Sequence, residues 1–260
     1  MIGDDRLIED GFYCMDCFDG MAKIDDKSID MILCDLPYGT TQCSWDVIIP
    51  FEPLWKEYKR IIKDNGAIVL FGMEPFSSYL RISNIDMYKY DWIWDKVKGT
   101  GFLNAKKQPM RNHEIISVFY KNQCKYHPQM THGHKLKKSY RSKELQTSVY
   151  GEMKNDYVYE STDRYPRSIQ VFSTDTQNSS IHSTQKPVSL CEYLIKTYTD
   201  VGDLVLDNCA GSCSTGIACH NTGRRFIGFE KDKEIFEKAN KRLTEHKAQI
   251  NLFDIGLERK

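Results

Sequence analysis

Four consecutive residues, Asp35-Leu36-Pro37-Tyr38, combine the groups that could hold an exocyclic amine. The run before them, residues 28–34, is largely apolar and predicts a buried strand. Proline has no N–H and cannot continue a central strand, so the motif ends the strand and leaves backbone carbonyls free to accept hydrogen bonds. The Asp35 carboxylate is a second acceptor, and the Tyr38 ring offers a stacking surface. This set suits adenine N6 or cytosine N4, although the same tetrapeptide alone would also suit an ordinary turn.

A second group of small residues, 207–216, joins a predicted strand to a predicted helix. Small side chains let a ligand approach the backbone, and N–H groups at a helix start bind anionic groups. Glu230 ends the next predicted strand, where a carboxylate accepts hydrogen bonds from both ribose hydroxyls. The pattern predicts an adenosine-containing cofactor and leaves NAD and S-adenosylmethionine open. The candidate cofactor-binding residues here are Asp207, Asn208, Cys209, Ala210, Gly211, Ser212 and Glu230.

Basic residues are concentrated between Lys96 and Lys143. This segment holds twelve basic residues and one acidic residue, Glu114, so its charge is +11 in a chain whose formal net charge is zero. Tyrosines and histidines lie among the basic residues, and this mixture favours a nucleic-acid surface over an ordinary solvated charge run. The DNA-binding residues that we predict are Lys106, Lys107, Arg111, Lys135, Lys137, Lys138 and Arg141.

The remaining pattern alternates short apolar strands with amphipathic helices. Strands are expected at 12–15, 28–34, 67–71, 88–94, 114–120, 203–207 and 225–230, with helices at 18–24, 50–63, 74–83, 186–198, 213–222 and 232–247. This alternation predicts a mostly parallel sheet with right-handed crossovers. Periodicity fades from 121 to 180, which we interpret as an inserted recognition region because a structureless loop of that length is uncommon in a compact domain.

Composition limits the class of protein. A chain of 260 residues with 40% hydrophobic residues can form one sizeable α/β domain with an insertion. No apolar run approaches the ~20 residues of a membrane span, and the first residues lack the features of a signal peptide. Nine cysteines without a secretion signal indicate reduced thiols and a cytoplasmic protein. The pairs Cys14/Cys17 and Cys209/Cys213 have no histidine at ligand spacing, so we expect no metal.

These motifs together resemble the β-class amino-methyltransferases that act on DNA, especially the short phage and prophage type. The resemblance covers nearly everything outside roughly 121–165. Asp35-Leu36-Pro37-Tyr38 is similar to the catalytic Asp-Pro-Pro-Tyr motif, and His182-Ser-Thr-Gln-Lys-Pro187 is similar to the motif before the cofactor helix. Residues 205–216 and 223–230 resemble the cofactor turn and the acidic strand that follows it. The order, catalytic motif first and cofactor motif last, is that of the β class.

The resemblance implies a Rossmann-like methyltransferase fold in which seven strands form a mostly parallel sheet with helices on both faces, closed by contacts between the two ends of the chain. Residues 1–120 would form the catalytic half, 121–180 the target-recognition region and 181–260 the cofactor half. S-adenosylmethionine is the implied cofactor, with Asp16 near its adenine, Glu230 on its ribose and Lys186 near its methionine moiety. The implied cofactor-binding set also includes Cys17, Asp35, His182 and Thr184.

Two departures from the family pattern affect the site. Leu36 replaces the first proline of the motif. We expect this change to be tolerated, because the acceptor at this position is the backbone carbonyl and not the side chain. Cys209 and Cys213 replace the usual phenylalanine and second glycine, so we expect Cys213→Gly to tighten cofactor binding.

The predicted reaction is methylation of adenine N6 in duplex DNA after base flipping, with Asp35, Leu36, Pro37 and Tyr38 as catalytic residues. Methylation of cytosine N4 is the alternative within this chemistry, and a catalytically weak DNA-binding module is the alternative of another class. Covalent methylation of cytosine C5 is excluded because no proline is followed by cysteine. A second copy of the chain, forming a homodimer, and a cognate restriction endonuclease remain open as partners. We expect no membrane partner.

Overall fold

The computed structural model describes residues 10–40, 46–141, 157–174 and 185–257. The chain divides into two compact units. Residues up to His127, together with those from Ser168 onwards, form the first unit, and Pro128–Arg167 form the second. Each unit is described by itself below.

The first unit is built on an eight-stranded sheet in the order β1-β10-β9-β2-β3-β5-β4-β8. Neighbouring strands are parallel except where β5 lies antiparallel to both β3 and β4. The eighth strand corrects the expectation of seven: β8 has three residues, too few to give a periodic signal in the sequence. The strands are β1 (Gly11–Cys14), β2 (Ile29–Cys34), β3 (Ile62–Gly72), β4 (Tyr88–Thr100), β5 (Arg111–Phe119), β8 (Ile169–Val171), β9 (Leu204–Asp207) and β10 (Arg225–Glu230).

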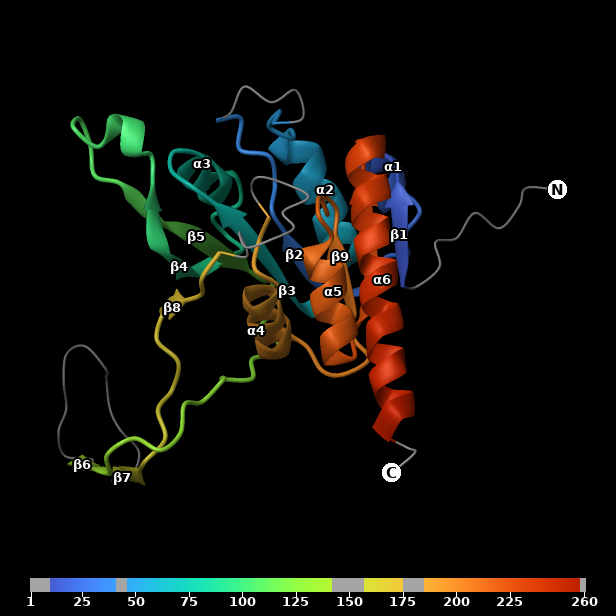
Figure 1. The fold of residues 1–260 in the computed structure, drawn as a ribbon. Coiled ribbons are helices and arrows are strands. Elements are labelled where there is room, and N and C mark those ends of the chain that lie inside the picture. The colour runs from blue at the N-terminus through green and yellow to red at the C-terminus, as the bar shows by residue number, and fades with distance from the viewer. Residues whose placement is uncertain (1–9, 41–45, 142–156, 175–184, 258–260) are drawn as a thin grey trace. The chain divides into compact units, whose positions relative to one another are not determined.

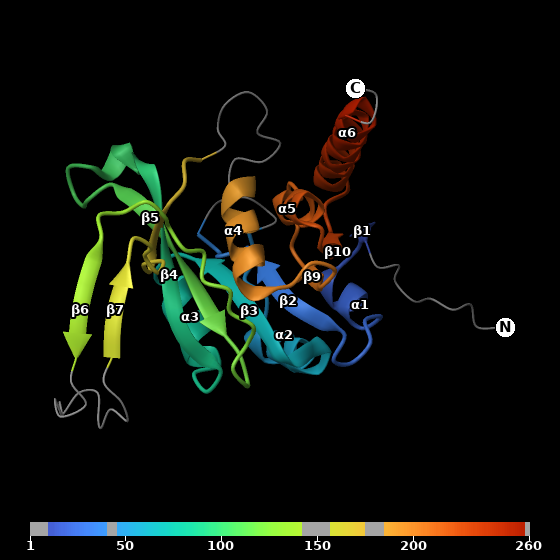
Figure 2. The ribbon, with the colours of Figure 1, turned by 90° about the horizontal axis from the view of Figure 1, so that it is seen from below.

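Helices cover both faces of this sheet (Figures 1 and 2). Successive side chains of β2 point to opposite faces. Met31 and Leu33 pack in one core with residues of α4, α5 and α6, whereas Ile32 and Cys34 pack in the other with residues of α1, α2 and α3. The helices are α1 (Cys17–Met21), α2 (Phe51–Ile61), α3 (Phe76–Ser83), α4 (Val188–Tyr198), α5 (Ser214–Thr222) and α6 (Lys233–Leu257), with a 3-10 turn, η1 (Phe102–Asn104).

The two ends of the chain meet at one side of the sheet. The N-terminal strand β1 pairs in parallel with β10, and the ring of Phe12 lies 4.8 Å from that of Phe236 on α6. The catalytic and cofactor halves meet at the centre, where β2 pairs with β9. This arrangement confirms the expected Rossmann-like fold and places the ends of β2, β9 and β10 at one edge.

The second unit contains an antiparallel pair, β6 (Lys137–Arg141) and β7 (Tyr157–Ser161). Outside this pair, Thr131 and Arg164 form a bridge, and the Arg164 guanidinium donates to the Lys135 carbonyl at 2.5 Å and the Ser161 carbonyl at 2.9 Å. The unit is shorter than the expected 121–180 segment. Residues 121–127 belong to the first unit, where Cys124 is buried and the His127 N–H donates to the Thr197 carbonyl.

Within the described ranges, we find no helix that is both long and apolar enough to span a bilayer.

Candidate active site

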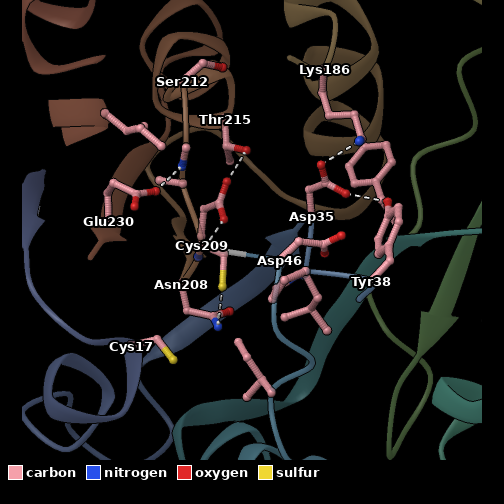
Figure 3. A pocket seen from close by; sticks show the side chains of 18 of the residues that line it. Cys17, Asp35, Tyr38, Asp46, Lys186, Asn208, Cys209, Ser212, Thr215 and Glu230 are labelled. Atoms are coloured by element: carbon pink, nitrogen blue, oxygen red, sulfur yellow. Dashed lines mark hydrogen bonds and ion pairs between the residues drawn. The ribbon is translucent and has the colours of Figure 1, made fainter. Parts of the chain in front are cut away.

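A cavity of about 1000 Å³ opens at the carboxyl ends of the central strands. The residues that follow β1, β2, β9 and β10 all contribute to its wall, because parallel strands end at the same edge of the sheet. Figure 3 shows Asp35 beside Lys186 and Tyr38, with Glu230 across the cavity from them. One space therefore holds both the candidate amine site and the candidate cofactor site.

The Asp35 carboxylate has a partner on each oxygen. Lys186 Nζ lies 2.5 Å from Oδ2, and the Tyr38 hydroxyl donates to Oδ1 at 2.5 Å. A carboxylate offers about four lone-pair positions, so each oxygen can accept one further hydrogen bond. Asp35 is thus held in a fixed orientation and keeps acceptor capacity for an amine.

Glu114 on β5 extends this cluster into a row of alternating charges. Its side chain is only 7% exposed, and it lies 3.3 Å from Lys186 and in direct contact with Lys96. Burial would raise the pKa of Glu114, but Lys186 and Lys96 outweigh burial and hold that pKa below its usual range. For Asp35, burial raises the pKa above its usual range, with Lys186 opposing and Glu114 adding to the shift.

The turn after β2 is fixed by Asp46. The Gly39 and Thr40 N–H groups donate to its two carboxylate oxygens at 2.8 and 2.9 Å. The Tyr38 ring packs 5.0 Å from that of Phe76. These contacts hold the Tyr38 ring at the cavity wall, where one face of a planar ligand could lie against it.

The turn between β9 and α5 is held from three sides. Gly211 has φ +50°, a conformation that favours glycine, and its N–H donates to Glu230 Oε2 at 3.0 Å. The Asp232 N–H donates to the other Glu230 oxygen at 2.8 Å, and Arg242 on α6 donates to the Ser212 carbonyl at 2.8 Å. Below the turn, Asp207 accepts from the Thr215 hydroxyl, and burial raises the Asp207 pKa to about 6.

The charges around the cavity distinguish between adenosine cofactors. Seven carboxylates and three lysines line it, and each lysine is paired: Lys96 with Glu114, Lys186 with Asp35 and Glu114, and Lys231 with Asp16 at 3.1 Å. A pyrophosphate would therefore find carboxylates and no unpaired lysine among the described lining residues. A cationic sulfonium fits an acidic cavity, and Glu230, which we predict from the sequence to bind a ribose, is one of the carboxylates that line it.

Most of the site residues predicted from the sequence come together here. Asp16, Cys17, residues 35–38, Lys186, residues 207–212 and Glu230 all line the cavity. Lys186, which we expect to lie near a methionine moiety, lines the cavity and contacts the Asp35 and Glu114 carboxylates. His182 and Thr184 lie outside the described residues. Of the predicted DNA-binding residues, Lys106 and Lys107 follow η1 and Arg111 begins β5, whereas Lys135, Lys137, Lys138 and Arg141 belong to the second unit.

Sequence reasoning missed five charged residues that line the cavity: Asp46, Lys96, Glu114, Lys231 and Asp232. Asp46 sits in a polar loop and gives no signal before the fold is known. Glu114 did give one, because a single carboxylate in a strongly basic segment, at the start of an apolar strand, needs a buried cationic partner.

Cys213 adopts a left-handed backbone conformation, with φ +61°, and its side chain is fully buried in the core. It is not among the residues that line the cavity, so any tighter cofactor binding by Cys213→Gly must come from the backbone of the turn.

The left-handed conformation of Cys213 also affects stability. A left-handed L-residue costs about 1–2 kcal/mol, and the buried side chain contributes roughly 1 kcal/mol. We therefore expect Cys213→Ala to be less stable than Cys213→Gly by about 1 kcal/mol in urea unfolding. Equal stabilities would contradict the strain at this position.

The acceptor motif at the tip of β2 shares its cavity with the cofactor turn, and it comes before that turn in the sequence. These two features define an amino-methyltransferase with permuted motif order. The family comparison agrees: residues 29–241 match the DNA methylase family of N6 and N4 methyltransferases, and the chain belongs to that family.

Relatives of this chain include type II methyltransferase M.HpaI of Haemophilus parainfluenzae, 28% identical over 96% of this chain and 77% of the relative. M.HinfI of Haemophilus influenzae is 28% identical over 91% of this chain and 68% of the relative. Among solved structures, the M1.HpyAVI–SAM complex has a TM-score of 0.61 at 24% identity, covering 89% of this chain and 98% of that one. PvuII DNA methyltransferase, described as cytosine-N4-specific, has a TM-score of 0.63 at 15% identity, with coverage of 94% and 93%. These structures support the fold.

Proposed function

We propose that this DNA methyltransferase transfers a methyl group from S-adenosylmethionine to N6 of an adenine flipped out of duplex DNA. The observation that carries the proposal is the shared cavity, in which Asp35 lies at the tip of β2 and the Gly211–Glu230 cofactor turn lies at the tips of β9 and β10. The family membership of the chain supports DNA as the substrate.

The bound cofactor supplies an electrophilic methyl group on a sulfonium sulfur. The protein's task is to make the amine a better nucleophile, because the N6 lone pair is delocalised into the purine ring. Asp35 and the Leu36 carbonyl accept hydrogen bonds from the two N–H bonds and so localise the lone pair on nitrogen. Such preorganised acceptors stabilise the transition state more than the ground state. N6 loses one proton as it gains the methyl group, and Asp35, with its raised pKa, is placed to accept it.

Aspartate at position 35 favours adenine over cytosine through the family resemblance, since the same acceptor pair also suits cytosine N4. Incubation with labelled S-adenosylmethionine and duplex DNA, followed by digestion to nucleosides and mass analysis, distinguishes these products. We expect N6-methyladenine. N4-methylcytosine would overturn the choice of base, and unmodified DNA would overturn the proposed activity. A cognate restriction endonuclease acting at the same site is part of the proposal.

Glu114 is proposed to tune the acidic limb of the pH profile. Activity requires ionised Asp35 and is lost as pH falls through its raised pKa. Glu114→Gln removes a negative neighbour that raises this pKa, so the acidic limb of kcat should move to lower pH. Glu160→Gln, an exposed change in the second unit, should leave the limb unchanged. If Glu114→Gln lowers the rate but leaves the acidic limb of kcat at the wild-type pH, Glu114 has only a structural role and does not set the pKa of Asp35.

The predicted basic residues are proposed to contact DNA phosphates. Lys138 already pairs with Glu160 at 2.7 Å, which reduces its net effect on a polyanion. Replacing Lys137 with alanine should therefore lower the slope of log affinity against log salt by about 0.9 for each phosphate that the protein no longer neutralises. Lys138→Ala should change the slope less. A slope that is unchanged in Lys137→Ala would remove this residue from the DNA interface.

A further inference from the structure

The hairpin between β4 and β5 ends in an exposed apolar tip. Phe102 and Leu103 are 78% and 97% exposed. They begin η1 and follow Gly101, whose φ of +88° turns the chain sharply. Two large adjacent apolar side chains in water suit a surface that is covered during function.

The backbone fixes the direction of this hairpin. Val97 has φ +67°, an unusual value for a β-branched residue, and its N–H donates to Asp95 Oδ1 at 2.8 Å. The register of β4 against β5 shifts between Asp95 and Thr100, and pairing resumes at Thr100 and Arg111. Strained conformations of this kind persist where the surrounding structure holds them, often at functional sites.

The base of the hairpin belongs to the active-site wall. Lys96 and Thr100 line the same cavity as Asp35. Phe102 follows Thr100 by two residues, so its Cα lies within about 7 Å of the Thr100 Cα. The apolar tip therefore lies close to the cavity that would receive a flipped base.

The charge around the tip identifies the kind of partner. From Lys96 to His113 the chain contains no acidic residue. Lys96 pairs with Glu114 in the cavity wall, and the other four basic residues are exposed: Lys98, Lys106, Lys107 and Arg111. A cationic hairpin with an apolar tip is complementary, in charge and in polarity, to a polyanion with an apolar interior. Duplex DNA has this chemistry, because phosphates surround stacked bases.

We propose that Phe102 and Leu103 insert into the base stack at the position that the target nucleotide leaves. This inference rests on the proposed function, since it requires a flipped base. Flipping costs unpairing and unstacking, and an inserted aromatic or aliphatic side chain restores part of the stacking that flipping removes. The four exposed basic residues of the hairpin hold the flanking phosphates while the tip is inserted.

The test uses the full chain with Phe102 and Leu103 both replaced by alanine. The matched control replaces Ile82 and Ile85 with alanine, since these exposed apolar side chains (73% and 60%) lie at the end of α3 and just before β4, at the end of that strand opposite the hairpin tip. The target site is first mapped on DNA modified by the wild-type protein. Two short duplexes are then compared: a fully paired one, and one with an abasic site opposite the target base, in which flipping is easier.

We expect the tip variant to methylate the paired duplex roughly tenfold to a hundredfold more slowly than wild type, because it no longer offsets the cost of unstacking. On the abasic duplex its rate should return to within about threefold of wild type. Cofactor binding should be unchanged, and the Ile82/Ile85 control should match wild type on both duplexes. Wild-type rates on the paired duplex, or an equal loss on both duplexes, would overturn the insertion. A wild-type protein that methylates neither duplex would overturn the proposed function itself, and the insertion with it.

Discussion

Replacing Asp35 with asparagine is expected to reduce methyl transfer by at least about a hundredfold, the range seen when one preorganised transition-state hydrogen bond is removed. The change keeps the size of the side chain but removes its charge and replaces one acceptor oxygen with a donor. Lys186 then loses an anion at 2.5 Å, and the amine loses its stronger acceptor. The measurement is the single-turnover rate with cofactor and DNA both saturating, accompanied by separate binding titrations of each.

Tyr38→Phe provides a matched control for Asp35→Asn. It removes only the hydroxyl that donates to Asp35 at 2.5 Å and keeps the ring that lines the cavity. Its rate should fall by about tenfold, the effect of one ordinary hydrogen bond. If Asp35→Asn turned over within tenfold of wild type while binding both ligands, Asp35 would not be the acceptor.

The second large effect is expected at Glu230. Glu230→Ala should weaken S-adenosylmethionine binding by about a hundredfold, because hydrogen bonds to a charged group contribute roughly 1.5–3 kcal/mol each. Two effects combine: the ribose loses its acceptor, and the Gly211 and Asp232 N–H groups lose theirs. Burial raises the Glu230 pKa, so the affinity of the wild type should also fall as the pH drops and this carboxylate is protonated.

Isothermal calorimetry of cofactor binding measures this change. Glu234→Ala removes an exposed carboxylate in the first turn of α6 that does not line the cavity, and should leave the affinity unchanged. A Glu230→Ala protein with wild-type affinity would place the ribose elsewhere in the cavity.

The sequence predicts the elements whose apolar residues form a clear pattern, either a helical period or an unbroken apolar run. The strand expected at 28–34 is β2, and the continuous apolar run at 67–71 lies within β3, because strands buried on both faces leave an unbroken apolar signal. The sequence predicted neither the outer half of β4 nor any of the strands β6, β7 and β8. Their residues are polar or few, and their pairing depends on partners far away in the sequence.

The site divides in the same way. Asp35, Gly211 and Glu230 could be predicted because each lies at or shortly after the end of a recognisable strand, and the ends of parallel strands converge at one edge of the sheet. Asp46 and Lys96 could not, since each reaches the site through a loop or a hairpin bulge that no periodicity marks. Glu114 lies between these cases: its isolation in a basic segment was visible, and its contacts with Lys96 and Lys186 required the fold.

The central claim is that Asp35 and the Leu36 carbonyl bind the amine that receives the methyl group. The most direct test is a crystal structure of the protein with a non-reactive S-adenosylmethionine analogue and duplex DNA carrying the mapped site. The account predicts an extruded adenine with N6 about 2.7–3.2 Å from Asp35 and from the Leu36 carbonyl oxygen, and its ring against Tyr38. A target base that stays stacked in the duplex, or one whose amine is bound by other residues, would contradict it.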